Sequence, residues 1–221
     1  TRYMNSVIGE PCAVESSFTN YVKATPDSLF RKVNMKQYDK YIPKYPEVYD
    51  LYRVNRVLNV TSKTSSDSLQ NLNTLNSETL KTLGPNKQVN IIYIVTGITD
   101  PNYRYALESA WKGGKKNDVI IVLGTSESKI LWNDIITFGS NKNNELLKVT
   151  LRDAINDLAI FDPSKLNDIV KANILVNFKR IEMKEFEYLK DDITPSTGLV
   201  IILFILSIGG SIGLSIFFSR N

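Results

Sequence analysis

The sequence predicts an α/β fold: a three-layer α/β/α sandwich with a mostly parallel central sheet, plus a single C-terminal transmembrane helix. Two short apolar runs, "QVNIIYIVTG" and "NDVIIVLG", are rich in β-branched residues and end in glycine, as strands covered on both faces do. A helical pattern of suitable length lies between them, which makes a β-α-β unit with parallel strands. The chain then carries twenty uncharged residues, Leu199 to Phe218, about the length that a helix needs to cross a bilayer.

The amino-acid composition excludes several classes of function. The 221 residues suit one domain plus an accessory segment, and they contain no histidine, which excludes Ser-His-Asp and Cys-His catalysis and histidine-ligated zinc. Cys12 is the one cysteine, so these residues form no internal disulfide and no CxxC pair. The net charge is +4, but lysine and arginine are scattered among 23 acidic residues without a basic stripe. We therefore expect no nucleic-acid partner.

Residues 1–60 are rich in tyrosine and proline, and we expect this segment to pack on the domain. Its tyrosines recur every three or four residues and are interrupted by prolines: Tyr38, Tyr41, Tyr45, Tyr49 and Tyr52. Amphipathic tyrosines that pack short helices over a sheet are the favoured interpretation, and an aromatic ligand slot is the alternative. Residues 61–87 follow as a polar loop and an amphipathic helix, which Gly84-Pro85 is expected to stop.

The predicted core covers residues 88–178. Between the first two strands, "TDPNYRYALESAWKGG" predicts a helix with Asp100 as N-cap and Gly113-Gly114 at its end. A third strand is predicted at "KILWNDIITFG". The next segment, "NNELLKVTLRDAINDL", has the spacing of a helix with Leu147, Leu151, Ile155 and Leu158 on one face, and another helix begins at Asp162-Pro163.

A charged juxtamembrane stem, residues 179–197, leads to the predicted transmembrane helix, residues 198–219. A buried core helix is the alternative, but core helices rarely run this far without a polar face. The small residues Gly209, Ser211 and Gly213 predict packing against another helix, in a second copy of the chain or in another protein. The positive charges before the span (Lys179, Arg180, Lys184 and Lys190) favour a cytoplasmic domain, although folded domains follow that rule weakly.

The turn before the second strand is a candidate cation site. Asn117 and Asp118 offer an amide and a carboxylate oxygen, which suit a hard cation such as calcium or magnesium, and Asp100 is a further candidate ligand. Ordinary turn chemistry explains the same residues, with glycine ending a helix and Asn-Asp shaping the turn. We favour the turn and keep the cation as an alternative.

Residues 88–160 resemble the TPM domain family. The matching features are a strand that ends near Thr96, a helix that ends in a Trp-Gly corner, a lysine-bearing Asn-Asp turn before the next strand, and a later strand that ends in glycine; the residues are Thr96, Trp111, Gly113, Gly114, Lys116, Asn117, Asp118 and Gly139. The resemblance implies an α/β/α fold, a divalent-cation site, with Ca²⁺ as the ion, and an exported domain beside a transmembrane helix. It also implies a role in assembling or repairing membrane complexes, and phosphatase activity in some members.

We expect a membrane-anchored, non-catalytic interaction module that supports assembly, maintenance or regulation of a membrane complex. Its predicted contacts are the corner at Trp111, Gly113 and Gly114 and the small-residue face of the span. A divalent-cation-dependent phosphatase-like hydrolase, built on Asp100, Asp118 or Asp134, is the alternative. A structural protein of a phage or bacterial envelope is the second alternative. The resemblance places the domain outside the cytoplasm.

Overall fold

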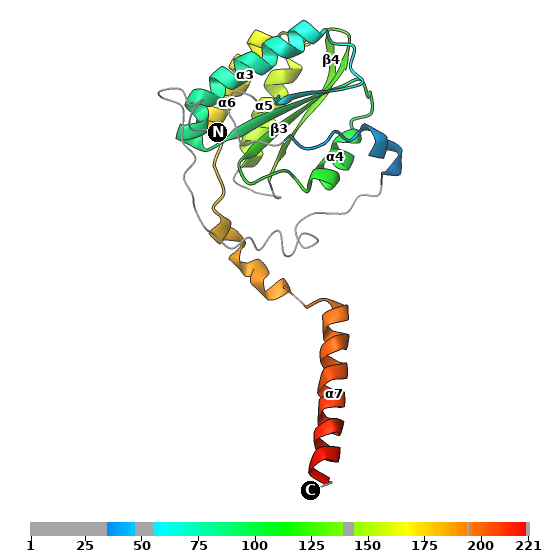
Figure 1. Cartoon of the computed structure of the whole chain (residues 1–221). Helices are drawn as coiled ribbons and strands as arrows, with labels where there is room; N and C mark the ends of the chain where they lie inside the picture. Colours follow the sequence, from blue (N-terminus) through cyan, green and yellow to red (C-terminus); the bar gives the residue numbers. More distant parts are fainter. Residues whose placement is uncertain (1–34, 47–54, 139–143, 194, 220–221) are drawn as a thin grey trace, which may run out of the picture.

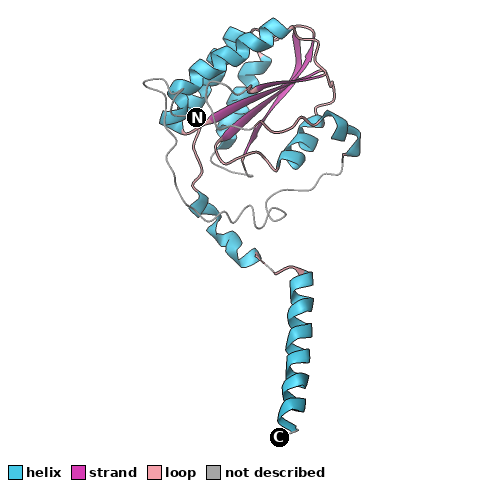
Figure 2. Cartoon of the chain, in the orientation of Figure 1, coloured by secondary structure: helices cyan, strands magenta, loops and turns pink. Residues whose placement is uncertain are grey.

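A four-stranded sheet of order β1-β2-β3-β4 forms the middle layer of the head in the computed structural model, which describes residues 35–46, 55–138, 144–193 and 195–219 (Figures 1 and 2). The strands are β1 (Val57–Val60), β2 (Asn90–Thr96), β3 (Asp118–Ser126) and β4 (Lys129–Thr137). The first three are parallel, and β4 returns antiparallel to β3 through a tight turn. The predicted α/β/α sandwich with a mostly parallel sheet is confirmed.

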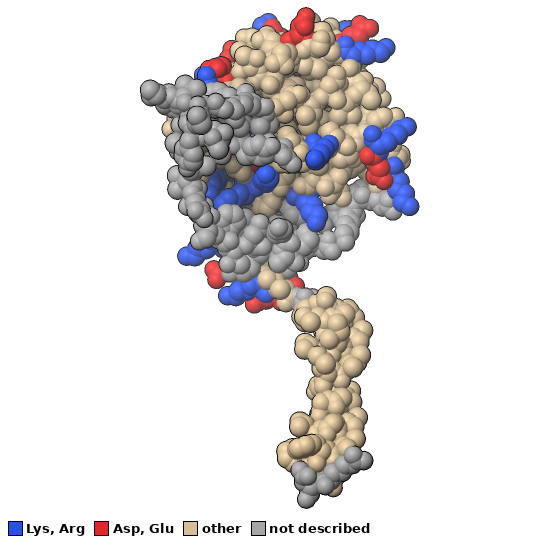
Figure 3. Space-filling model, in the orientation of Figure 1, with Lys and Arg blue, Asp and Glu red and all other residues tan. Residues whose placement is uncertain are grey.

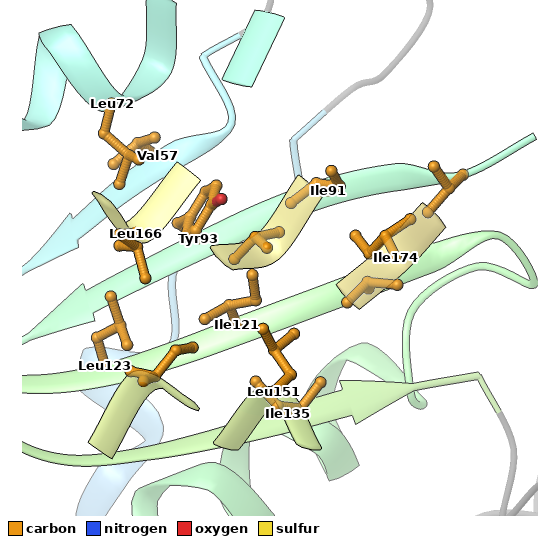
Figure 4. Close-up of a cluster of buried hydrophobic side chains, with 14 of the residues drawn as sticks. Val57, Leu72, Ile91, Tyr93, Ile121, Leu123, Ile135, Leu151, Leu166 and Ile174 are labelled. Atoms are coloured by element: carbon orange, nitrogen blue, oxygen red, sulfur yellow. The ribbon is translucent and has the colours of Figure 1, made fainter. Parts of the chain in front are cut away.

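Three helices cover one face of the sheet: α3 (Ser66–Lys87), α5 (Glu145–Asn156) and α6 (Pro163–Asn177). We call this the helical face. Every second residue of the central strands points into it, so that Ile91 and Tyr93 of β2 meet Leu72 of α3 in a fully buried core (Figure 4). The predicted apolar stripe of α5 is confirmed, because Leu147, Leu151 and Ile155 are buried here.

The opposite face carries α4 (Tyr103–Trp111) and residues 35–46, which we call the strap; we call this the strap face. The strap contains the short 3-10 helix η2 (Lys36–Tyr41) and continues as extended chain. The alternate residues of the strands, including Ile92, Ile94 and Ile120, are buried beneath these two elements. Because α4 has only nine residues, the strap completes the cover of this face.

The two parallel connections have opposite handedness. Both β1-α3-β2 and β2-α4-β3 step in the same direction across the sheet, yet α3 and α4 lie on opposite faces. Two right-handed crossovers would place both helices on one face, so one connection departs from the usual rule.

Two helix boundaries differ from the sequence prediction. Helix α3 does not stop at Gly84-Pro85 but continues to Lys87, with the N–H of Gln88 donating to the carbonyl of Gly84. Pro85 has no N–H to donate, so the last turn lacks one backbone hydrogen bond, and the bond from Gln88 to Gly84 closes it. Asp100 does not cap α4 itself: its side chain accepts from the N–H of Asn102 in a preceding turn, and the helix begins at Tyr103.

The stem is attached to the head before it reaches the last helix. Buried Asn144 accepts from the backbone N–H of Lys179 at 3.0 Å and donates to the carbonyl of the same residue at 2.9 Å. The stem helix η4 (Met183–Asp192) then places Phe186 edge-on against Phe138, just after β4, with 5.4 Å between ring centroids. These contacts fix the base of the stem to the α5 and β4 side of the head.

Helix α7 (Thr197–Ser219) extends away from the head and is long and apolar enough to cross a membrane (Figure 1). Its 23 residues span about 34 Å at 1.5 Å per residue. None of its residues is buried in the structure, and Figure 3 shows charged side chains on the head and stem but none along the described length of α7. A core helix would be covered by the head, so a single-pass membrane segment is the simpler explanation.

Candidate functional site

Asp118 is the centre of a buried polar network at the amino-terminal ends of the parallel strands. One carboxylate oxygen accepts from the Tyr45 hydroxyl of the strap at 2.7 Å and from the backbone N–H of Lys115 at 2.7 Å. The other oxygen accepts from the amide of Asn90, the first residue of β2, at 2.9 Å. Asn90 in turn accepts from the guanidinium of Arg56, which precedes β1 and is 1% exposed. The network therefore joins three strands, a turn and the strap.

This arrangement uses the Asp118 carboxylate for structure. Burial raises the pKa of the Asp118 carboxyl, although hydrogen bonds from Asn90, Lys115 and Tyr45 act in the opposite direction. Burial also raises the pKa of the Tyr45 hydroxyl, which keeps it a proton donor to Asp118. Asn117 contributes its backbone carbonyl to the N–H of Asn90. The Asn117-Asp118 turn thus has the ordinary role that the sequence favours.

Asp100 lies at the other end of the sheet. It follows the carboxyl end of β2, accepts a short hydrogen bond from the Tyr38 hydroxyl, and has a pKa lowered chiefly by that bond. Asp118 pairs with Asn90 at the start of β2, so the length of the strand separates the two carboxylates, about 20 Å at the usual rise per residue. The structure therefore does not bring Asp100 to Asn117 and Asp118.

The third candidate carboxylate for a hydrolase, Asp134, lies on β4 and faces α4. Its carboxylate is 3.3 Å from Nε of Arg104, and Arg104 also pairs with Glu108 at 3.4 Å. Within the described parts of the chain, no three acidic or cysteine side chains come together as a metal site. The Ca²⁺ site stays a prediction.

The corner at the end of α4 is occupied by contacts within the chain. The indole N–H of Trp111 donates to the carbonyl of Pro43 in the strap at 2.9 Å, and the ring meets Tyr45 edge-on. Gly113 and Gly114 have φ of 71° and 81°, and a Cβ on Gly114 would stand 2.8 Å from the Asp118 carboxylate. The glycines therefore let the turn close on Asp118.

The carboxyl ends of the parallel strands carry a group of hydroxyl side chains. Ser62 and Thr125 lie 2.6 Å apart between their hydroxyl oxygens, and Thr64 contacts both Thr125 and the carbonyl of Glu127. The side chain of Thr96 accepts from the N–H of Ile98. These groups satisfy one another and join the ends of three strands.

The small residues of α7 divide between two faces. Gly209 and Gly213 are one turn apart, and a Cβ on either would meet nothing within 4 Å. Ser211 is two positions from each, about 200° around the helix, and its hydroxyl donates to the carbonyl of Ser207. One partner helix could face the two glycines but not Ser211 as well.

Sequence reasoning found Asp118 and Asp100 but missed their partners. Tyr38 and Tyr45 were visible only as part of a tyrosine series, and Arg56 and Asn90 carried no signal because their pairing depends on strand register. Cys12, Gly139, Tyr49 and Tyr52 lie outside the described residues.

Comparisons with known proteins add one likeness. No protein-family model matches the chain, and no curated protein matches it. Among solved structures, the chain is similar to the solution NMR structure of the N-terminal domain of the cg2496 protein from Corynebacterium glutamicum, with 18% identity and a TM-score of 0.38. The match covers 59% of this chain and 84% of that one. At this TM-score the likeness supports no further conclusion.

Proposed function

We propose that the chain is a membrane-anchored, TPM-like interaction module that supports assembly, maintenance or regulation of a membrane complex, without catalysis of its own. Helix α7 is the observation that carries the proposal: it is uncharged, 23 residues long and uncovered by the head. A helix of this kind is unfavourable in water and favourable in a bilayer.

The attachment of the stem supports a role close to the membrane. The two hydrogen bonds between Asn144 and Lys179 and the packing of Phe186 on Phe138 attach the stem to the head as far as η4. A head so fixed stays near the bilayer, where a partner in the same membrane meets it at high local concentration.

The separate roles of the three carboxylates favour docking over phosphatase-like hydrolysis. Asp100 accepts a hydrogen bond from Tyr38, and Asp118 accepts hydrogen bonds from Tyr45 and Asn90. Asp134 forms an ion pair with Arg104. Each carboxylate is at a different place on the sheet. Metal-assisted hydrolysis of a phosphoester needs carboxylates that converge on shared ions. Proteins are the partners that we propose, reached through the face of Gly209 and Gly213 and through the head, which the TPM resemblance would place outside the cytoplasm.

Membrane anchoring is tested by flotation of the purified full chain with phospholipid vesicles. We expect the chain to float and to resist alkaline extraction. Arginine in place of Leu206 and Ile208 should release it, because each charge at the centre of a span costs about 3 kcal/mol. Matched variants with Leu206→Ile and Ile208→Leu should behave as the natural chain does. A natural chain that stays with the soluble fraction would contradict the anchor.

Two further measurements distinguish the docking proposal from the hydrolase alternative. In membranes solubilised with a mild detergent, the chain should migrate in a complex larger than its own 25.0 kDa. In the presence of calcium, magnesium or manganese, the natural chain should hydrolyse a generic phosphoester no faster than the double variant with Asp118→Asn and Asp134→Asn does. Metal-dependent turnover that these substitutions abolish would replace the docking proposal with the hydrolase.

A further inference from the structure

We propose that Asn59 is the acceptor of an N-linked glycan, attached to the head at the edge that lies away from the stem. The inference rests on the proposed function, because the transferases that attach such glycans work outside the cytoplasm, where the TPM resemblance would place the head. It adds a modification site to the docking module, and it assigns the side of the membrane on which the module docks. The acceptor motif, the exposure of Asn59 and the position of Asn59 on the sheet support it.

The acceptor motif is Asn59-Val60-Thr61. An asparagine that is followed by any residue except proline, and then by serine or threonine, is the sequence in which the side-chain amide receives an oligosaccharide. No other asparagine of the 221 residues stands in such a sequence. The chain therefore has one candidate acceptor, and a single residue is enough to test it.

Asn59 is the exposed position of a strand that is otherwise covered. Val57 and Val60, at the two ends of β1, are 4% and 7% exposed, and Leu58 is half-buried. An asparagine whose side chain is enclosed in the core has no room for a sugar. At Asn59 a bulky, solvated group meets water instead of the core, as N-linked glycans require.

The partners of the Asn59 amide are local. Its oxygen accepts from the backbone N–H of Ser62 at 2.9 Å, and Nδ2 donates to the carbonyl of Ser62 at 3.3 Å, across the turn that ends β1. Nδ2 carries two hydrogens, and it has no further partner among the described residues. A glycosylated amide keeps one of these hydrogens. The sugar therefore displaces no contact between Asn59 and the rest of the head.

The chemical step takes its nucleophile from Asn59 and its sugar from a membrane donor. Nδ2 attacks the anomeric carbon of an oligosaccharide that is carried on a polyisoprenyl diphosphate. The new C–N bond forms as the bond between the anomeric carbon and the diphosphate oxygen breaks. The diphosphate leaves with the electron pair of that bond, Nδ2 releases one proton, and nothing is oxidised or reduced. The hydroxyl of exposed Thr61 is the second group of the motif that the transferase recognises.

Strand β1 stands at the edge of the sheet, which leaves space for a glycan. It pairs with β2, and no other described strand follows on its outer side. An open strand edge can pair with another chain, and proteins prevent this by covering or blocking the edge. A glycan on Asn59 would therefore meet no described strand, and it would shield the edge from unwanted pairing.

The motif and the stem lie at opposite edges of the head. Thr61 follows the carboxyl end of β1. The stem attaches at the other edge, where Phe186 packs on Phe138. Phe138 follows the end of β4, and this end pairs with the start of β3. The glycan therefore leaves the stem side of the head free for a partner in the membrane.

Enzymatic removal of the glycan in labelled water tests the modification in the natural chain. The full chain is isolated from its native membranes in detergent and treated with peptide N-glycosidase in H₂¹⁸O, which converts a glycosylated asparagine to ¹⁸O-labelled aspartate. Trypsin cuts after Arg56 and Lys63, so that residues 57–63 form one peptide for mass spectrometry. We expect the label at Asn59 in most copies, together with faster migration in gels after treatment. A peptide that contains only unmodified Asn59 would overturn the proposal.

Two variants of Thr61 form a matched pair for gels of chains expressed in the same cells. Thr61→Ser keeps the hydroxyl of the motif and Thr61→Ala removes it, and both replace a β-branched residue at the same backbone conformation, with φ of 58°. We expect the change in migration to persist in Thr61→Ser and to be lost in Thr61→Ala and in Asn59→Gln. Circular dichroism of each variant shows that the head remains folded. A Thr61→Ala chain that still carries the glycan would show that this motif is not the acceptor.

Failure of the modification differs visibly from failure of the proposed function. A chain that floats with vesicles but contains only unmodified Asn59 retains its anchor and lacks the glycan, which overturns this inference alone. A chain that carries the glycan but stays with the soluble fraction retains the modification and lacks the anchor, which overturns the proposed function alone.

Discussion

The two faces of the sheet are covered in different ways. On the helical face, three helices bury a continuous set of aliphatic side chains from all four strands (Figure 4). On the strap face, α4 has nine residues and the rest of the cover is a strap held by tyrosine–carboxylate and indole–carbonyl hydrogen bonds. Both covers bury apolar side chains of the sheet, but the strap is also held by side-chain hydrogen bonds at several points along its length. The larger share of the stability should therefore reside on the helical face, where three helices pack.

Leu72→Ala should cause the largest loss of stability. Leu72 is fully buried between α3 and the sheet, and its replacement leaves a cavity that close-packed helices cannot collapse. We expect a loss of about 3 kcal/mol in the free energy of unfolding, measured by urea unfolding of the full chain in detergent. Leu146→Ala is the control, since that leucine of α5 is 64% exposed and should change little. Similar losses in both variants would contradict the assignment of stability to the helical core.

Tyr45→Phe should weaken the strap face by a smaller amount. The phenylalanine keeps the ring against Trp111 but removes the donor to Asp118, one of three hydrogen bonds to a buried carboxylate. We expect a loss of about 2 kcal/mol, together with faster amide hydrogen exchange in residues 35–46. Tyr105→Phe is a suitable comparison, because Tyr105 is 44% exposed. Unchanged exchange in the strap would show that Tyr45 does not hold it.

The difference between the faces also explains what the sequence could predict. Strands β2 and β3 are continuous apolar runs, buried at every position of β2 and at all but the last of β3, and helices α5 and α6 bury residues at intervals of three and four. Both patterns can be recognised in a sequence. Strand β1 was missed because it has four residues with an exposed Asn59 among them. The Tyr–Asp pairs were missed because the partners are 62 and 73 residues apart, and only the packed sheet brings them together.

The two carboxylates that hold the strap should respond to pH with opposite signs. The pKa of Asp118 is raised in the folded chain, so its contribution to stability is present below its unfolded pKa, about 3.9, and is lost as pH rises through the folded value. The pKa of Asp100 is lowered, chiefly by Tyr38, so its contribution is present above about 3.9 and is lost as pH falls through the folded value.

Substitution by asparagine reveals each contribution separately. As pH rises through the acidic range, the stability of the natural chain should fall relative to Asp118→Asn and rise relative to Asp100→Asn. Urea unfolding at a series of pH values measures both differences, and each variant is the control for the other. If both stability differences, natural chain minus variant, changed with pH in the same direction, the two carboxylates would have the same electrostatic environment, and the assignment would be wrong.

Tyr93→Phe should have the smallest effect, and it should be stabilising. Tyr93 is fully buried on the helical face, and its hydroxyl has no hydrogen-bond partner among the described residues, while burial raises its pKa (Figure 4). Removing an unpaired buried hydroxyl relieves its desolvation cost, so we expect a gain of up to about 1 kcal/mol in the free energy of unfolding. Tyr103→Phe is the matched comparison, because that hydroxyl binds the strap and its removal should destabilise. A loss of stability in Tyr93→Phe would mean that the hydroxyl is satisfied by a buried water molecule, and that polar contacts stabilise the helical face as well as the strap face.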